Sequence, residues 1–449
     1  MATQKSSGLE NVGGLAFHII ASKLGPFEAA SLSCVNKRFN DWASDDSLWS
    51  VFCSHELHLS SPIDPLGNSC SSFKAAYGAW REAFAMYPWP LVRRVKNVWD
   101  RIKIWLRDNY PKALRTLRKG ASEVKLNTLE KSLRVRLPLP TRLLYRFCDG
   151  QEHVNNVLES TMSGDLYGLM GGYYHDNYLV NVYLLPLRDI IEETRVVTRA
   201  NMYAPRIKHI VMASSCTYSS KMFLLDCEVG QLYVGTKTFS STREMMPCVP
   251  SGLITSVHDL RNGPQQDAML LWLEEHVRRL ENGIIKLRKE RNVRGISLFP
   301  EQPPICSLAT TCGVQVHASA VFVPEFSDLL EEEDKYMFAY SIRMSLKPEG
   351  CFVHGMCFDS CQLYWRHWII KSNGYVVGDI NGEGVIGLHP LLHPGKKECV
   401  YVSCITVAAS PGSMEGSFTF ISGSLVDPKG SPFEVEVARF PLVLPDYIF

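Results

Sequence analysis

Residues Leu9–Phe52, LENVGGLAFHIIASKLGPFEAASLSCVNKRFNDWASDDSLWSVF, form the stretch around which the rest of the chain is organised. Its spacing predicts three short helices. The first carries four apolar residues on one side: Leu15, Ile19, Ile20 and Leu24. Gly25-Pro26 is a pair that ends a helix. The second predicted helix begins near Glu28, and its apolar stripe steps by three, four and three: Leu32, Val35, Phe39 and Trp42.

A third predicted helical turn follows Ser44–Ser47, a run of residues with N-cap chemistry, and carries Leu48, Trp49 and Phe52. A segment of about 40 residues seldom buries this much Leu, Ile and Trp by itself. The stretch therefore predicts a surface that docks on a partner.

The order of these residues resembles the F-box, and Val12-Gly13 stands where most F-boxes have Leu-Pro. The resemblance implies docking on the Skp adaptor, and through it on cullin and RING subunits. It implies these Skp-binding residues: Leu15, Ile19, Ile20, Leu24, Pro26, Leu32, Val35, Phe39, Leu48 and Trp49. We place the centre of this contact at Ile20, Leu24, Val35 and Trp49. The alternative is that these helices form the corner of a larger helical domain.

Length and composition indicate a globular chain of about three domains, with 449 residues and 46% hydrophobic residues. Lys plus Arg number 47 and Asp plus Glu 46, so no strong charge favours nucleic acid or membrane as a partner. No apolar run is long enough to span a bilayer, and residues 1–8 lack the apolar core of a signal peptide. We therefore expect a cytoplasmic and/or nuclear protein with free thiols at its 14 cysteines.

One cysteine cluster has enough ligands for zinc: Cys351, His354, Cys357 and Cys361. It lacks the paired C-x2-C spacing of zinc sites, and Cys357 and Cys361 flank a segment typical of the beginning of a strand. We predict no metal site and no cofactor.

The chain after the F-box (residues 8–58) begins with a connector over 59–91 that contains four regularly spaced aromatics: Phe73, Tyr77, Trp80 and Phe84. Residues 92–260 then show helical patterns first, followed by strand patterns at 180–185, 207–213, 221–226 and 231–234. This order predicts an α+β domain. The segments GASE at 120–123 and LPLPTRLLYRFCDGQ at 137–151 resemble the SUKH (Smi/Knr-like) family, which implies a binding module.

Residues 261–300 are predicted to be a spacer helix and linker. Apolar residues step by three and four over about two and a half heptads: Leu270, Leu273, Val277, Leu280, Ile284 and Leu287. This length favours a helix packed against one of the domains over a dimer seam. The basic residues of 286–294 are expected to form a solvated helix face, with a role in nuclear import or nucleic-acid binding as the alternative.

Residues 301–449 change to period two, as in Phe433, Val435 and Val437, and Asn373-Gly374 is a hairpin turn. The pattern predicts an all-β sandwich. The segments YMFAY at 336–340, WRHWII at 365–370 and GEGVIG at 382–387 closely resemble ApaG, an immunoglobulin/fibronectin-like sandwich.

Gly382, Gly384 and Gly387 match a dinucleotide fingerprint, but Pro390 and Pro394 forbid the helix that such a site needs. Two roles stay open. One is an anion-binding loop in which backbone N–H groups and Arg366 hold a pyrophosphate-like group. The other, which we favour, is a bulge and turn.

No constellation of catalytic residues emerges from the sequence, and we predict a non-enzyme. The domain order resembles that of plant F-box proteins carrying an ApaG domain. That resemblance implies a substrate-recognition adaptor of a Skp–cullin–F-box ubiquitin ligase. The alternative is a binder or sensor of a pyrophosphate-containing small molecule. We expect a protein substrate to bind the ApaG sandwich, with its aromatic hairpin (Tyr364, Trp365, Trp368, Tyr375), and the SUKH domain is the second choice.

Overall fold

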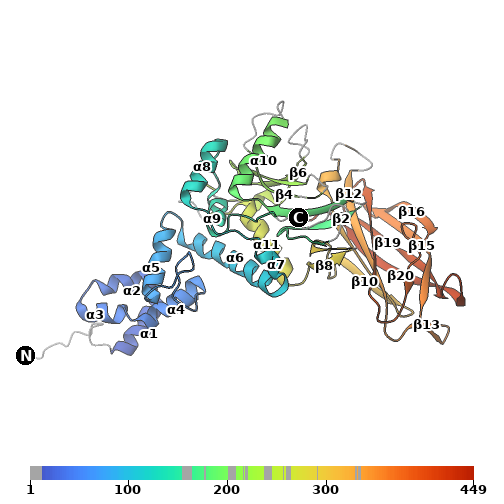
Figure 1. The fold of residues 1–449 in the computed structure, drawn as a ribbon, viewed down its shortest axis with the longest axis horizontal. Helices are drawn as coiled ribbons and strands as arrows, with labels where there is room; N and C mark the ends of the chain where they lie inside the picture. The colour runs from blue at the N-terminus through green and yellow to red at the C-terminus, as the bar shows by residue number, and fades with distance from the viewer. Residues whose placement is uncertain are drawn as a thin grey trace, which may run out of the picture. The chain divides into compact units, whose positions relative to one another are not determined.

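The computed structural model describes residues 13–153, 164–175, 178–200, 209–215, 217, 221–236, 245–255, 257–258, 264–290, 292–328, 331 and 335–449. The chain divides into two compact units, residues 1–100 and 101–449, and α6 (Trp89–Asn109) spans the boundary between them (Figure 1).

The described part of the first unit is helical: α1 (Gly14–Leu24), α2 (Pro26–Ser33), α3 (Lys37–Ala43), α4 (Asp46–Leu57) and α5 (Phe73–Ala83). The break predicted at Gly25-Pro26 is confirmed. The expected continuous helix from Glu28 to Trp42 is wrong, because α2 ends at Ser33. Asn36 then caps α3, its side-chain oxygen accepting the backbone N–H of Phe39 at 2.8 Å.

The connector predicted over 59–91 contributes to the core of this unit through α5. Tyr77 and Trp80 are buried. The Tyr77 hydroxyl donates to Glu56 at 2.7 Å, and the Trp80 Nε1–H donates to the Ile63 carbonyl at 2.9 Å. These aromatics therefore pack on their neighbours, as the spacing predicted.

The second unit begins with helices and a mixed sheet. Its helices are α7 (Pro111–Leu114), α8 (Glu123–Leu133), α9 (Leu139–Phe147), α10 (Leu187–Ala200) and α11 (Ala268–Glu281). The strands are β1 (Gly164–Asp165), β2 (Gly171–His175), β3 (Tyr178–Leu184), β4 (His209–Ser215), β5 (Met222–Asp226), β6 (Leu232–Gly235), β7 (Met246–Pro247), β8 (Lys286–Glu290) and β9 (Val293–Ser297). Their order is β1-β9-β2-β3-β4-β5-β6-β7, with β8 on β9. The predicted strands are confirmed, except that 207–208 lie outside the described residues.

The predicted spacer helix is shorter than the apolar spacing suggested. α11 ends at Glu281, Gly283 has φ +66°, and residues 286–290 and 293–297 pair as β8 and β9 of the central sheet. The apolar spacing that ran on to Leu287 therefore predicted the helix wrongly beyond Glu281. Residues 261–300, expected to be spacer and linker, contribute α11 and two strands to the central region.

The last region is an all-β sandwich, as predicted. One sheet has the order β10-β11-β12-β18: β10 (Cys306–Thr311), β11 (Val314–Phe322), β12 (Tyr336–Leu346) and β18 (Cys399–Val407). The other has the order β16-β15-β19-β20, with β17 (Leu391–Leu392) on β15: β15 (Cys361–Ser372), β16 (Tyr375–Glu383), β19 (Gly412–Gly423) and β20 (Pro428–Leu442). A separate small hairpin pairs β13 (Cys351–Val353) with β14 (Met356–Phe358).

Local patterns explain these strands. Asn373 and Gly374 both have positive φ, as a two-residue hairpin turn requires. On β20, Phe433, Val435 and Val437 are buried while the glutamates between them are exposed.

The central sheet and the sandwich are packed together within the second unit. Both faces of β12 are largely buried, because residues of β2 contact one of them. The end of the chain also returns to the central region (Figure 1). We call residues 443–449 the C-terminal tail. The Lys221 Nζ donates to the Phe449 carbonyl at 2.7 Å, and the Trp272 Nε1–H donates to the Ile448 carbonyl at 2.7 Å.

Candidate functional site

The first unit exposes apolar side chains along α1, α2 and the turn that follows. α1 buries Phe17 and Ala21, which leaves its other side open to solvent. Leu15, Phe27 and Val35 have exposed fractions of 78%, 74% and 62%. We define the α1–α2 surface as the exposed apolar residues of this region: Leu15, Ile19, Ile20, Leu24, Phe27 and Val35. Large apolar side chains gathered in this way mark a protein-binding surface.

The other predicted Skp-binding residues lie deeper. Phe39, Leu48 and Trp49 are buried in the core of the first unit, and the Trp49 Nε1–H donates to the Ala43 carbonyl at 2.7 Å. Pro26 and Leu32 are half-buried. Trp49 is thus a core residue of the first unit, and its place at the centre of the Skp contact stays a prediction. Phe27 is a surface residue that sequence reasoning missed, although its place directly after Gly25-Pro26 was visible.

The glycine-rich loop lies at the end of β16. Gly384 and Gly387 have φ of +55° and +69°, and an isolated bridge pairs Val385 with Leu388. The Nη1 of Arg366 donates to the carbonyls of Glu383 and Gly384, at 3.1 and 2.8 Å. These contacts fit the turn role, and the anion-binding role of Gly382, Gly384, Gly387 and Arg366 stays a prediction.

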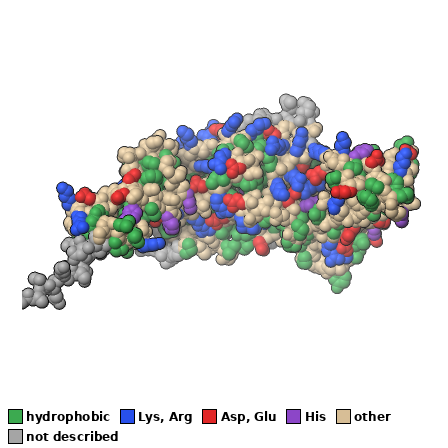
Figure 2. Space-filling view, turned by 90° about the horizontal axis from the view of Figure 1, so that it is seen from below, with side chains coloured by type: hydrophobic (Ala, Val, Ile, Leu, Met, Phe, Trp, Pro, Cys, Tyr) green, Lys and Arg blue, Asp and Glu red, His purple; other side chains and the backbone are tan. Residues whose placement is uncertain are grey.

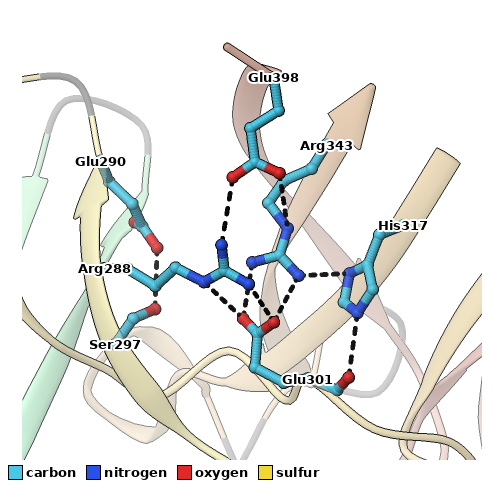
Figure 3. Close-up of polar contacts among 7 residues, drawn as sticks. All are labelled: Arg288, Glu290, Ser297, Glu301, His317, Arg343 and Glu398. Atoms are coloured by element: carbon cyan, nitrogen blue, oxygen red, sulfur yellow. Dashed lines mark hydrogen bonds and ion pairs between the residues drawn. The ribbon is translucent and has the colours of Figure 1, made fainter. Parts of the chain in front are cut away.

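A carboxylate joins the central sheet to the sandwich (Figure 3). Glu301 accepts from Arg288 of β8 and from Arg343 of β12, whose Nη1 and Nη2 lie 2.6 and 2.8 Å from its oxygens. The Arg343 Nη2 also donates to His317 Nδ1 at 2.8 Å, and Arg288 lies 3.2 Å from Glu398. We call these five residues the Glu301 cluster.

Burial alone would raise the pKa of Glu301, but hydrogen bonds and charge from Arg343 and Arg288 outweigh it and lower this pKa to about 2. Burial and the charge of Arg343 lower the pKa of His317 to about 4. At neutral pH Glu301 is therefore a carboxylate between two guanidiniums, and His317 is a neutral imidazole. The charged members of the cluster pair with one another across β8 and β12. The cluster therefore holds the central sheet and the sandwich together.

Beside this cluster is a cavity of about 260 Å³ between β2, β3, β8 and β9. Glu290 lines it and accepts from the Ser297 hydroxyl at 2.8 Å, and burial raises the pKa of Glu290. The sequence predicted that the basic residues of 286–294 lie on a solvated helix face. The structure instead puts Lys286, Arg288 and Lys289 on β8 and Arg294 on β9, so the helix expectation is wrong for these four residues.

Within the described ranges, no three His, Cys, Asp or Glu side chains come together as metal ligands would. Cys357 lies on β14, and Cys361 begins β15.

None of the described helices has the length and hydropathy to cross a membrane. Figure 2 shows Lys/Arg and Asp/Glu interspersed over the face in view.

Comparison with known proteins covers the sandwich and the whole chain. The family model described as ApaG domain matches residues 327–422. Protein ApaG of Dechloromonas aromatica is 33% identical over 132 residues, 29% of this chain and 91% of that protein. F-box only protein 3 of Homo sapiens is 24% identical over 420 residues, 92% of this chain and 78% of that protein.

A plant relative matches along almost the full length. F-box protein SKIP16 of Arabidopsis thaliana is 54% identical over 444 residues, which are 98% of this chain and 100% of that protein. The aligned residues include the helical unit, the central sheet and the sandwich. The chain therefore belongs to the F-box protein family that SKIP16 represents, with an ApaG domain in its C-terminal part.

Proposed function

We propose that this protein is a substrate-recognition adaptor of a Skp–cullin–F-box ubiquitin ligase and docks on Skp through the α1–α2 surface. The observation that carries the proposal is the exposure of Leu15, Ile19, Ile20, Leu24, Phe27 and Val35 on one small helical unit. Burying such side chains is worth about 1.5–3 kcal/mol each, so a partner that covers them gains affinity. Membership of the F-box protein family indicates Skp as that partner.

The adaptor works by proximity. Docking places the cullin and RING subunits on one side, and the second unit holds a protein substrate so that its lysines reach the charged ubiquitin-conjugating enzyme. The rate comes from effective concentration and requires no catalytic residue on this chain. As part of this proposal, the ApaG sandwich is the first candidate for holding the substrate, and the central sheet, as a SUKH-type binding module, is the second.

The test measures Skp affinity of the intact protein by calorimetry. Leu15→Ala combined with Leu24→Ala removes two exposed side chains, and we expect a loss of at least ~2 kcal/mol, about 30-fold in Kd. The matched control is Val124→Ala, an equally exposed apolar residue on α8, which we expect to leave Kd unchanged. Unaltered Skp affinity in the double variant would overturn the proposal.

Trp49→Ala distinguishes a loss of folding stability from a loss of direct contact with Skp. Because Trp49 is buried, its truncation is expected to cost about 3–5 kcal/mol of folding free energy. Its loss of Skp binding should therefore accompany a lower melting temperature. The Leu15 and Leu24 double variant should instead lose binding while its melting temperature stays near that of the parent.

A further inference from the structure

β16 is the outermost strand of its sheet in the sandwich (Figure 1). Among the described residues its strand partner is β15 alone. Its sequence, YVVGDINGE, contains no Lys, Arg or Pro, which are residues that commonly protect an edge strand from pairing. Near the hairpin turn, a bulge between Ile370 and Lys371 shifts the pairing of the two strands. Beyond it, Gly378–Glu383 pairs with β15 in regular register. This segment is therefore an open edge.

The backbone pattern of this edge follows from one hydrogen bond. The Gly384 N–H donates to the Tyr364 carbonyl at 2.9 Å, so pairing toward β15 falls on every second residue from Gly384 backward. The peptide groups of Asp379, Asn381 and Glu383 consequently point away from β15. Arg366 already occupies the Glu383 carbonyl, so the groups that can extend the sheet are chiefly those of Asp379 and Asn381.

The side chains of the edge alternate between two chemistries. Toward the interior of the sandwich lie Gly378, Ile380 and Gly382. Ile380 pairs with the buried Trp368 yet is 44% exposed. The space over Gly378 is filled by the Ile370 side chain, and the space over Gly382 by the Arg366 guanidinium. Beside Ile380 this face can therefore accept an apolar side chain from an added strand.

The opposite face of the edge is acidic, with Asp379, Asn381 and Glu383 in alternate positions. The Asp379 side chain is 65% exposed, and its contacts with His367 (2.8 Å) and Asn381 (3.4 Å) both use Oδ1. An added strand with Lys or Arg on this face would therefore find opposite charge directly across the pair.

We propose that β16 binds an extended segment of a protein substrate as an additional strand, with an apolar residue facing Ile380 and basic residues facing Asp379 and Glu383. This is β-augmentation, in which main-chain hydrogen bonds supply affinity and alternate side chains supply specificity. The inference rests on the proposed adaptor function and names the class of segment that it would take.

The test uses the intact protein and two fluorescent peptides, acetyl-(Lys-Val)4-amide and acetyl-(Glu-Val)4-amide, followed by anisotropy. We expect saturable binding of the Lys peptide, and at least tenfold weaker binding of the Glu peptide. Asn381→Pro removes an N–H that points away from β15, so it should weaken the Lys peptide at least tenfold while the β15–β16 pairing persists. The matched control, Asn381→Ala, keeps that N–H and should stay within twofold of the parent.

A second variant guards against misfolding of the proline substitution. Asp379→Lys combined with Glu383→Lys should reverse the preference, so that the Glu peptide binds more tightly than the Lys peptide. No saturable binding to the parent at millimolar peptide, or equal binding by Asn381→Pro, would overturn the proposal. Concentration-dependent dimerisation that Asn381→Pro abolishes would also overturn it and assign the edge to a second copy.

Skp affinity is measured on the same samples. Normal Skp binding without peptide binding refutes the edge-strand inference and leaves the adaptor proposal standing. Peptide binding without Skp binding refutes the adaptor proposal and supports the edge as a binding site for extended segments.

Discussion

Glu301 is the residue on which the joint between the central sheet and the sandwich depends. It is almost fully buried and sits between two guanidiniums, one from each side (Figure 3). Sequence reasoning missed it because its partners are 13 and 42 residues away and meet only when strands from both regions are paired. In contrast, the residues singled out in the sequence, such as Leu15 and Leu24, belong to a local helical pattern, which spacing alone reveals.

The Glu301 cluster predicts a pH dependence of stability. The pKa of His317 falls from 6.5 to about 4 in the folded state, and that of Glu301 falls from 4.5 to about 2. A lowered pKa means that the unfolded chain binds more protons, so the stabilising contribution is complete above the unfolded value and is lost on acidification. We expect the free energy of unfolding of the second unit to fall between pH 6.5 and 4 through His317, and between pH 4.5 and 2 through Glu301.

Glu301→Gln tests this assignment at the same site. Removing one partner of a buried ion pair costs about 3–5 kcal/mol at pH 7, and the part of the pH dependence below pH 4.5 should shrink with it. The comparison variant is Asp108→Asn, which breaks the exposed pair with Arg107 and should leave the free energy of unfolding nearly unchanged. Urea unfolding at several pH values measures both. An acid limb identical in the Glu301 variant and the parent would refute the role given to this carboxylate.

Elements were predictable where one local pattern decided them. Asn373-Gly374 marked the β15–β16 hairpin, and the alternation at 433–437 marked a strand covered on one side. The apolar spacing failed at two helix ends. It continued past Asn282-Gly283, where α11 stops, and past Asn36, where α3 starts. In both places the turn chemistry was present in the sequence, and an apolar spacing that happened to continue across it concealed the break.

The cap of α3 yields a prediction for that element. Asn36 satisfies the Phe39 N–H at the start of a helix of only seven residues, and loss of such a cap costs about 0.5–2 kcal/mol. We therefore expect Asn36→Ala to lower the stability of the first unit by roughly 1 kcal/mol. Asn36→Asp keeps a capping oxygen and should stay near the parent. Thermal unfolding followed by the fluorescence of the tryptophans in this unit compares them, and equal destabilisation by both variants would argue against capping.

At the scale of the molecule, the sequence predicted the succession of helical, mixed and all-β regions, but it did not predict that the last two share structure. Residues 286–290 and 293–297 were expected in the spacer helix and linker and lie in the central sheet. The C-terminal tail follows the sandwich in sequence and is seated on Lys221 and Trp272 of the central region. Such exchanges leave little signature in local patterns, because both partners look like ordinary core residues.

The tail therefore predicts how the central region responds to truncation. Lys221 is fully buried, burial lowers its pKa, and the Phe449 carbonyl is one of its few polar partners, together with Tyr173 and Glu325. Removing residues 447–449 takes away that acceptor and uncovers Trp272. We expect a loss of about 3–5 kcal/mol, seen as a lower melting temperature by calorimetry.

A second substitution shows why the tail matters. Lys221→Met leaves the buried Glu325 carboxylate without its cation, so it should destabilise the full-length chain. The same substitution should cost less in the truncated chain, where the amine has already lost the Phe449 acceptor. A cut after residue 300 removes the same tail, so such a chain should be destabilised in its central region before any question of substrate binding arises. If the chain lacking 447–449 melted at the temperature of the parent, the tail would be a surface appendage, and the central sheet and the sandwich would be held together chiefly by the Glu301 cluster.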